Sequence, residues 1–176
     1  MAFWTTLVAY ELVWLAAVSG AGHGLVWPGV AAVGLFAAWR VAASPCRRIE
    51  LKLIAVTVLL ALTLEALWVK SGIIVYSAPW PLPNAPAWLI ALWVAFALTL
   101  LPLFGHLHSR PALAALLGAV GGPLAYLGGA RAHALQLPAP AWRGLLALSM
   151  GWAAAMPSLT SLAGRWLRAS AIGDVS

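Results

Sequence analysis

Residues 53–69 read LIAVTVLLALTLEALWV, an apolar run interrupted by a single charged residue, Glu65. The hydrocarbon core of a bilayer is about 30 Å thick, so a helix needs about 20 apolar residues to cross it. Lipid offers no partner for an unpaired backbone N–H or C=O group, and a continuous apolar run satisfies these groups as a helix. The run therefore predicts a membrane-spanning helix over 53–69.

Comparable apolar runs recur along the rest of the chain. Hydrophobic residues make up 64% of the 176 residues and charged residues only 8%, whereas a soluble domain is about 25% charged. The runs lack the short alternating segments of a membrane barrel. The sequence predicts an all-α polytopic membrane protein, with one domain over 1–176 and a bundle of six transmembrane helices at 3–18, 26–41, 53–69, 87–104, 112–129 and 142–162.

Basic residues are unevenly divided between the two faces of this predicted bundle. Lysine and arginine accumulate in the cytoplasmic loops of membrane proteins, so the richer face is predicted to be cytoplasmic, together with both termini. The basic residues are spread over loop ends and form no stripe, which argues against a nucleic-acid partner. The richer face carries Arg40, Arg47, Arg48, Lys52, Arg110, Arg165 and Arg168, and the other carries Lys70, Arg131 and Arg143.

Small residues recur at four-residue spacing in the predicted helix 112–129. Ala114, Gly118 and Gly122 form one stripe, and such stripes allow two membrane helices to approach closely. We therefore expect this helix to be the most buried of the six, with 142–162 as its partner through Gly151 and Ala155. A second stripe lies beside the first and comprises Gly121, Ala125 and Gly129. Either stripe could equally be the contact surface of a homo-oligomer or of another membrane protein.

Pro123 lies in the middle of the same helix, where it removes one backbone hydrogen bond. The carbonyl that loses its donor needs another one, and a nearby polar group could supply it. Five tryptophans also lie deep within or near the ends of the apolar runs, where they could pack in the core or wall an apolar pocket: Trp14, Trp39, Trp68, Trp93 and Trp152.

Glu11 lies near the middle of the first run, TTLVAYELVWLAAV at 5–18, with no cation predicted at its depth. A carboxylate at the centre of a bilayer costs about 2.5–3.5 kcal/mol even on lenient insertion scales. Glu11 is therefore expected either to face an internal polar cavity or to be protonated. Its candidate neighbours are Thr63, Tyr126, Ser149 and the backbone freed at Pro123. Since intramembrane ionisable groups mark sites, Glu11 is the candidate catalytic residue.

Glu65 differs from Glu11 because cations are predicted in its layer. Lys70 follows it on the same helix, and Arg131 and Tyr126 reach the same depth from 112–129. For Glu65, as for Glu11, a buried hydrogen bond or ion pair that fixes helix register is one interpretation. The other is a substrate or lipid-headgroup site made of Glu65, Arg131 and Tyr126.

The four histidines fall into two pairs on opposite faces, so they assemble no zinc site. The chain has no phosphate-binding glycine loop, no HExxH and no nucleophile elbow. The sequence therefore predicts no metal and no cofactor, and it leaves open whether the protein is an enzyme.

Two segments carry a family resemblance: APWPLPNAPAWLIALWVAF at 78–96 and RPALAALLGAVGGPLAYLGGARAHAL at 110–135. With them the chain resembles the domain of unknown function 2878, a family of small bacterial inner-membrane proteins, over nearly its whole length. The resemblance implies a multi-pass protein of the bacterial inner membrane and carries no established activity. It also implies an association with genes for cyclopropane-type modification of unsaturated acyl chains, which is not a mechanism.

Three functions stay open at this stage. The first is a lipid-linked role, as an enzyme or accessory that holds an unsaturated acyl or isoprenoid chain of a membrane lipid, with Glu11 as proton donor and Arg131 as headgroup anchor. The second is a carrier of a small solute or a proton, with Glu11 as its relay. The third is a structural assembly subunit without catalysis.

Overall fold

The computed structural model describes residues 2–82 and 84–173. Two short strands, β1 (Val75–Tyr76) and β2 (Leu135–Gln136), pair antiparallel, and a 3-10 helix, η1 (Gly105–Ser109), precedes α5. Because helices account for nearly all the regular structure in these ranges, the predicted all-α class is confirmed. The six α-helices are α1 (Ala2–Gly22), α2 (Trp27–Ala43), α3 (Arg47–Lys70), α4 (Ala87–Thr99), α5 (Pro111–Arg131) and α6 (Ala141–Gly173).

Four of the described helices are long and apolar enough to cross a membrane: α1, α3, α5 and α6. The other two are apolar but shorter, with 17 residues in α2 and 13 in α4. At 1.5 Å of rise per residue, α4 is only about 20 Å long. The architecture is that of a helical membrane protein, in which four helices have spanning length.

The helix ends differ from the apolar runs for two physical reasons. α3 begins at Arg47 and not at 53, because a helix continues through charged residues once it leaves the apolar layer. α4 ends at Thr99 and not at 104. Pro102 cannot donate a backbone hydrogen bond and disfavours helical geometry at Leu101, so the chain turns into η1 instead.

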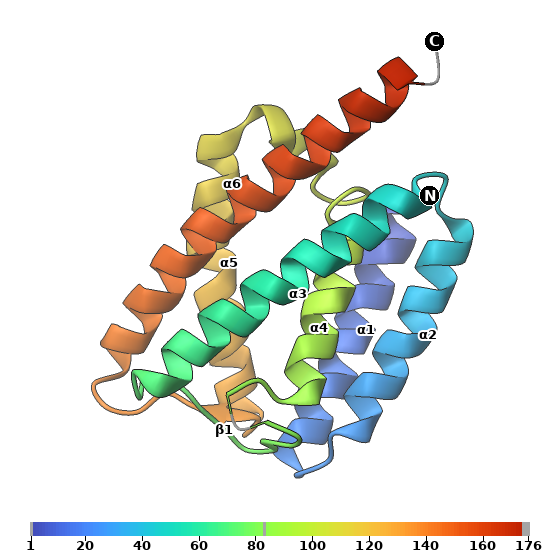
Figure 1. Ribbon diagram of the computed structural model, residues 1–176. Helices are drawn as coiled ribbons and strands as arrows, with labels where there is room; N and C mark the ends of the chain where they lie inside the picture. Colours follow the sequence, from blue (N-terminus) through green and yellow to red (C-terminus); the bar gives the residue numbers. More distant parts are fainter. Residues whose placement is uncertain (1, 83, 174–176) are drawn as a thin grey trace.

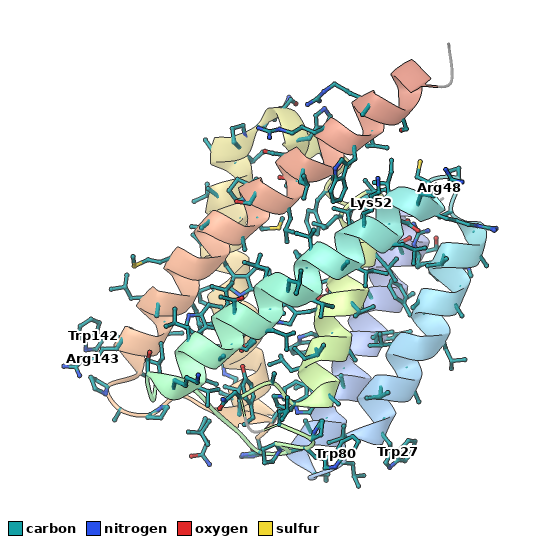
Figure 2. The ribbon with its side chains drawn as sticks, viewed as in Figure 1. Trp27, Arg48, Lys52, Trp80, Trp142 and Arg143 are labelled. Atoms are coloured by element: carbon teal, nitrogen blue, oxygen red, sulfur yellow. The ribbon has the colours of Figure 1, made fainter. Side chains whose placement is uncertain are left out.

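Consecutive helices run in alternating directions along the bundle (Figure 1). The start of α1 and the end of α6 both lie at the end where α3 begins, and β1 lies at the opposite end. Figure 2 shows that the labelled residues are divided in the same way, with Arg48 and Lys52 at the first end and Trp27, Trp80, Trp142 and Arg143 at the other.

The most buried helix is α4, and not α5 as predicted from its glycines. Nine of the 13 residues of α4 are buried, against six of 21 in α5. α4 packs on α1, α2 and α3, whereas α5 packs mainly on α6 and η1. The small-residue stripe brings α5 close to one helix, α6, whereas α4 is covered by three helices.

The stripe of Gly118 and Gly122 does join α5 to α6, as predicted. A Cβ atom added to Gly118 would overlap the backbone carbonyl of Trp152, and one added to Gly122 would overlap the Trp152 ring. Gly151 has a different partner from the predicted one, because a Cβ there would lie 2.5 Å from Cζ2 of Trp68 on α3. The stripe therefore packs inside the chain.

The carbonyl freed by Pro123 has a donor on the neighbouring helix. Pro123 has no N–H to give to the carbonyl of Ala119, four residues earlier. The hydroxyl of Ser149 on α6 donates to this carbonyl at 2.8 Å. Ser149 thus links α5 to α6 at the point where α5 loses its own hydrogen bond.

We expect Ser149→Ala to lower the free energy of unfolding by about 1–2 kcal/mol, because it leaves the Ala119 carbonyl without a donor. Ser158→Ala is the matched control, since the exposed Ser158 donates only to the Ala154 carbonyl of its own helix at 2.7 Å. The control should change stability by less than about 0.5 kcal/mol. Thermal unfolding of both variants in mild detergent measures the difference, and equal losses would contradict the proposed link.

Candidate functional site

A cavity of about 500 Å³ lies between α1, α4, α5 and α6. Small-molecule sites in proteins typically measure about 300–1,000 Å³, so the volume is that of a ligand site. Its lining is almost entirely apolar and rich in aromatic side chains from all four helices. These include Trp14 from α1, Trp88, Trp93 and Phe96 from α4, Tyr126 from α5 and Trp152 from α6.

The mouth of the cavity lies between α1 and α5, because the exposed residues of the lining come from these two helices. They are Glu11 on α1 and Leu117, Gly121 and Ala125 on α5. Glu11 lies about halfway along α1, and Gly121 about halfway along α5. Gly121 has no other atom near its Cβ position, so this part of the rim is open. The cavity therefore opens sideways, at mid-depth of two helices of spanning length.

Trp14 limits this mouth at the side nearer the ends of α1 and α5. A Cβ atom added to Gly128 would lie 2.9 Å from Cη2 of the Trp14 indole. Trp14 can approach α5 this closely only because residue 128 has no side chain. The carboxylate of Glu11 lies one helical turn before Trp14 on the same face of α1.

Stacked aromatic rings form the inner wall. The rings of Trp93 and Trp152 are parallel, with centroids 4.5 Å apart and an interplanar angle of 8°. Phe96 meets the Trp152 ring edge-on at 5.1 Å. Such offset and edge-to-face pairs are favourable aromatic arrangements and hold the rings in place. Gly122 leaves room for the Trp152 ring against α5.

Behind this wall, the carboxyl group of Glu65 accepts three hydrogen bonds. Tyr126 and Trp93 donate to Oε1, the latter at 2.9 Å, and Tyr76 donates to Oε2. Glu65 is 0% exposed and does not line the cavity. Burial raises the pKa of the Tyr76 phenol, which keeps it protonated as a donor. Glu65 therefore fixes two wall residues, Tyr126 and Trp93, from behind.

Of the two structural alternatives for Glu65, the structure has the buried hydrogen bonds and not the ion pair. Lys70 and Arg131 are both exposed, and within 2–82 and 84–173 neither forms a salt bridge with Glu65. Long basic side chains near helix ends extend toward the polar interface. The indole and the two phenols take the place of the cation around the buried carboxyl group.

The structure connects three of the four predicted site residues, because Tyr126 shares the cavity with Glu11 and donates a hydrogen bond to Glu65. Glu11 and Tyr126 both line the cavity, whereas Glu65 lies behind the wall and Arg131 lies exposed at the end of α5. Glu11 lines a mainly apolar cavity, so the first of its two expected environments, an internal polar cavity, is wrong.

The hydroxyl groups predicted near Glu11 have other partners. Thr63 donates to Leu59 of its own helix at 2.9 Å, and Ser149 donates to Ala119. No hydrogen bond or salt bridge of Glu11 is found in the described part of the chain.

Three of the five deep tryptophans, Trp14, Trp93 and Trp152, do line the cavity. Trp88, at the start of α4, also lines it. It is 1% exposed, because α4 lies inside the bundle.

A buried salt bridge also escaped the sequence reasoning. Nη2 of Arg40 lies 3.1 Å from Oε1 of Glu50, with both side chains buried between α2 and α3. Arg40 was counted among the loop cations, since it ends an apolar run, and its partner is ten residues further along the chain. The pair joins two neighbouring helices at the basic end and takes no part in the cavity.

No group of three or more metal-ligating side chains is found in the described residues. Comparisons with curated proteins and with solved structures give no match to this chain. A family model with the description "Protein of unknown function (DUF2878)" matches residues 3–158, and the chain therefore belongs to that family.

Proposed function

We propose that this protein takes the hydrocarbon chain of a membrane lipid, an unsaturated acyl or isoprenoid chain, from the bilayer into the cavity between α1, α4, α5 and α6. It does so in the bacterial inner membrane, with both termini in the cytoplasm, as an enzyme or accessory of lipid modification. Glu11 at the mouth is the candidate catalytic proton donor.

The sideways mouth is the observation that supports this function best. Glu11 and Gly121 lie about halfway along helices of spanning length, so the mouth opens where lipid chains lie. A water-soluble substrate would need an opening at one end of the bundle. A carboxyl group beside a bound chain is within reach of its carbons, and general acids act from such positions.

The remaining predicted residues take different roles. Tyr126 contacts the chain as part of the wall, and Glu65 holds Tyr126 in place. Arg131 lies six residues beyond Ala125 at the rim, which is about 9 Å along a helix. A lipid whose phosphate group binds Arg131 can therefore place its chain at the mouth.

The proposed orientation follows from the distribution of cations. Arg48 and Lys52 lie at the end where α1 begins and α6 ends, and Arg143 lies at the other (Figure 2). The end with more basic residues faces the cytoplasm in membrane proteins.

The test is a mass-spectrometric lipid profile of the native host after deletion of the gene and after its restoration. We expect the deletion to change the acyl or isoprenoid profile, the wild-type gene to repair it, and Glu11→Gln to fail. Arg143→Gln is the control, because it removes an exposed charge far from the mouth. Immunoblotting of membranes checks that all variants reach equal levels.

An unchanged profile after deletion would overturn the lipid-linked function and favour a carrier or an assembly subunit. A changed profile that Glu11→Gln repairs would keep the lipid role and remove Glu11 from it.

A further inference from the structure

The charge in the cavity is unbalanced. Of the described residues that line it, only Glu11 is charged, and no lysine, arginine or histidine is among them. The carboxylate of Glu11 has no hydrogen-bond or salt-bridge partner in the described ranges. An isolated negative charge next to hydrocarbon is unfavourable, and a positive group at the mouth would relieve this.

The aromatic walls add to the same preference. The faces of aromatic rings carry partial negative charge, and a cation within about 6 Å of a ring centroid is attracted to it. Trp14 and Tyr10 come from the same stretch of α1 as Glu11, and Trp93 and Trp152 lie deeper in the cavity. A carboxylate beside tryptophan and tyrosine rings is the environment in which proteins bind organic ammonium groups.

We infer that the cavity binds hydrophobic organic cations, such as an amine or quaternary ammonium group on an apolar body, with Glu11 as the counter-charge. The inference rests on the proposed function only in that the ligand enters from the bilayer, and it concerns the ionised form of Glu11, whereas proton donation requires the protonated form. A neutral hydrocarbon chain gains nothing from the charge of Glu11, whereas a cation gains an ion pair in a low-dielectric environment.

The test uses two ions of similar shape and opposite charge, tetraphenylphosphonium and tetraphenylborate. Each is titrated by equilibrium dialysis into purified protein in phosphatidylcholine nanodiscs, with nanodiscs without protein as the blank. We expect wild type to bind tetraphenylphosphonium at least about tenfold more tightly than Glu11→Gln does. Tetraphenylborate should bind no more weakly to Glu11→Gln than to wild type.

A matched pair of glycine variants tests the mouth independently of Glu11. Gly121 and Gly34 are both exposed and have open space at the Cβ position, but only Gly121 is at the rim. Gly121→Leu should weaken tetraphenylphosphonium binding about tenfold or more, and Gly34→Leu on α2 should leave it unchanged. Trp14→Leu should weaken it about threefold or more, and Trp4→Leu on the same helix should not.

Equal affinity of wild type and Glu11→Gln for the cation, or equal affinity of wild type for the two ions, would overturn the inference. So would absence of binding to wild type. The lipid profile separates this inference from the proposed function. If cation binding depends on Glu11 but deletion of the gene leaves the lipid profile unchanged, only the lipid role is overturned. If the wild-type gene repairs a changed lipid profile but the protein shows no preference for the cation, only the inference is overturned.

Discussion

A single added methyl group at Gly118 is expected to lower the free energy of unfolding by about 3 kcal/mol. In Gly118→Ala, the new Cβ overlaps the carbonyl carbon and oxygen of Trp152, which belong to a helix backbone and cannot rotate away. α5 and α6 must separate to admit it. Helix propensity acts in the opposite direction, because alanine stabilises a helix by about 1 kcal/mol relative to glycine.

Gly121→Ala is the matched control on the same helix. Nothing lies within 4 Å of its Cβ position, so only propensity acts and stability should rise by up to about 1 kcal/mol. The two variants are compared by thermal unfolding in mild detergent. A loss of stability in Gly118→Ala with a gain in Gly121→Ala supports the α5–α6 contact. Equal changes in the free energy of unfolding would show that α5 and α6 do not approach closely at Gly118.

The second large loss of stability is expected when Glu65 is replaced. Glu65→Leu removes the acceptor of Tyr76, Trp93 and Tyr126 and leaves three buried donors unpaired. Each unpaired donor costs about 1–3 kcal/mol, so the total loss should exceed about 3 kcal/mol. Glu65→Gln retains one acceptor oxygen and should lose less. Unfolding in detergent gives the stability, and quenching of tryptophan fluorescence reports the inner wall.

Two controls separate this cluster from the ion pair expected from the sequence. Tyr10→Phe removes a hydroxyl from a cavity residue that shares no hydrogen bond with Glu65, and it should change stability by less than about 0.5 kcal/mol. Arg131→Gln should also be nearly neutral, since Arg131 is exposed. A loss for Arg131→Gln as large as that for Glu65→Leu would show that an ion pair is present after all.

The helices could be predicted from the sequence because apolar length is a local property. Each of the six apolar runs corresponds to a helix. Their burial could not be predicted in the same way. α4 is central although it is the shortest helix, and its position depends on contacts with α1, α2 and α3 that no local pattern records. The small-residue stripe of α5 identified a close contact but not the most buried helix.

The site was only partly predictable because counting residues along a helix gives depth and not direction. Depth placed Glu11 in the middle of its helix and Tyr126 in the same layer as Glu65. In the structure Glu11 and Tyr126 line one cavity, and Tyr126 donates a hydrogen bond to Glu65. Direction decides the rest: Arg131 points outward, and Trp93 points toward Glu65 from α4. Tyr76 reaches Glu65 from a two-residue strand that hydrophobicity alone does not reveal.

The contact of Trp14 with Gly128 couples the residue sizes at two positions that are distant in the chain. The indole fills the space that any side chain at 128 would need. A larger residue at 128 therefore requires a smaller residue at 14. The size of the opening thus depends on these two positions together, and a smaller residue at 14 would widen it.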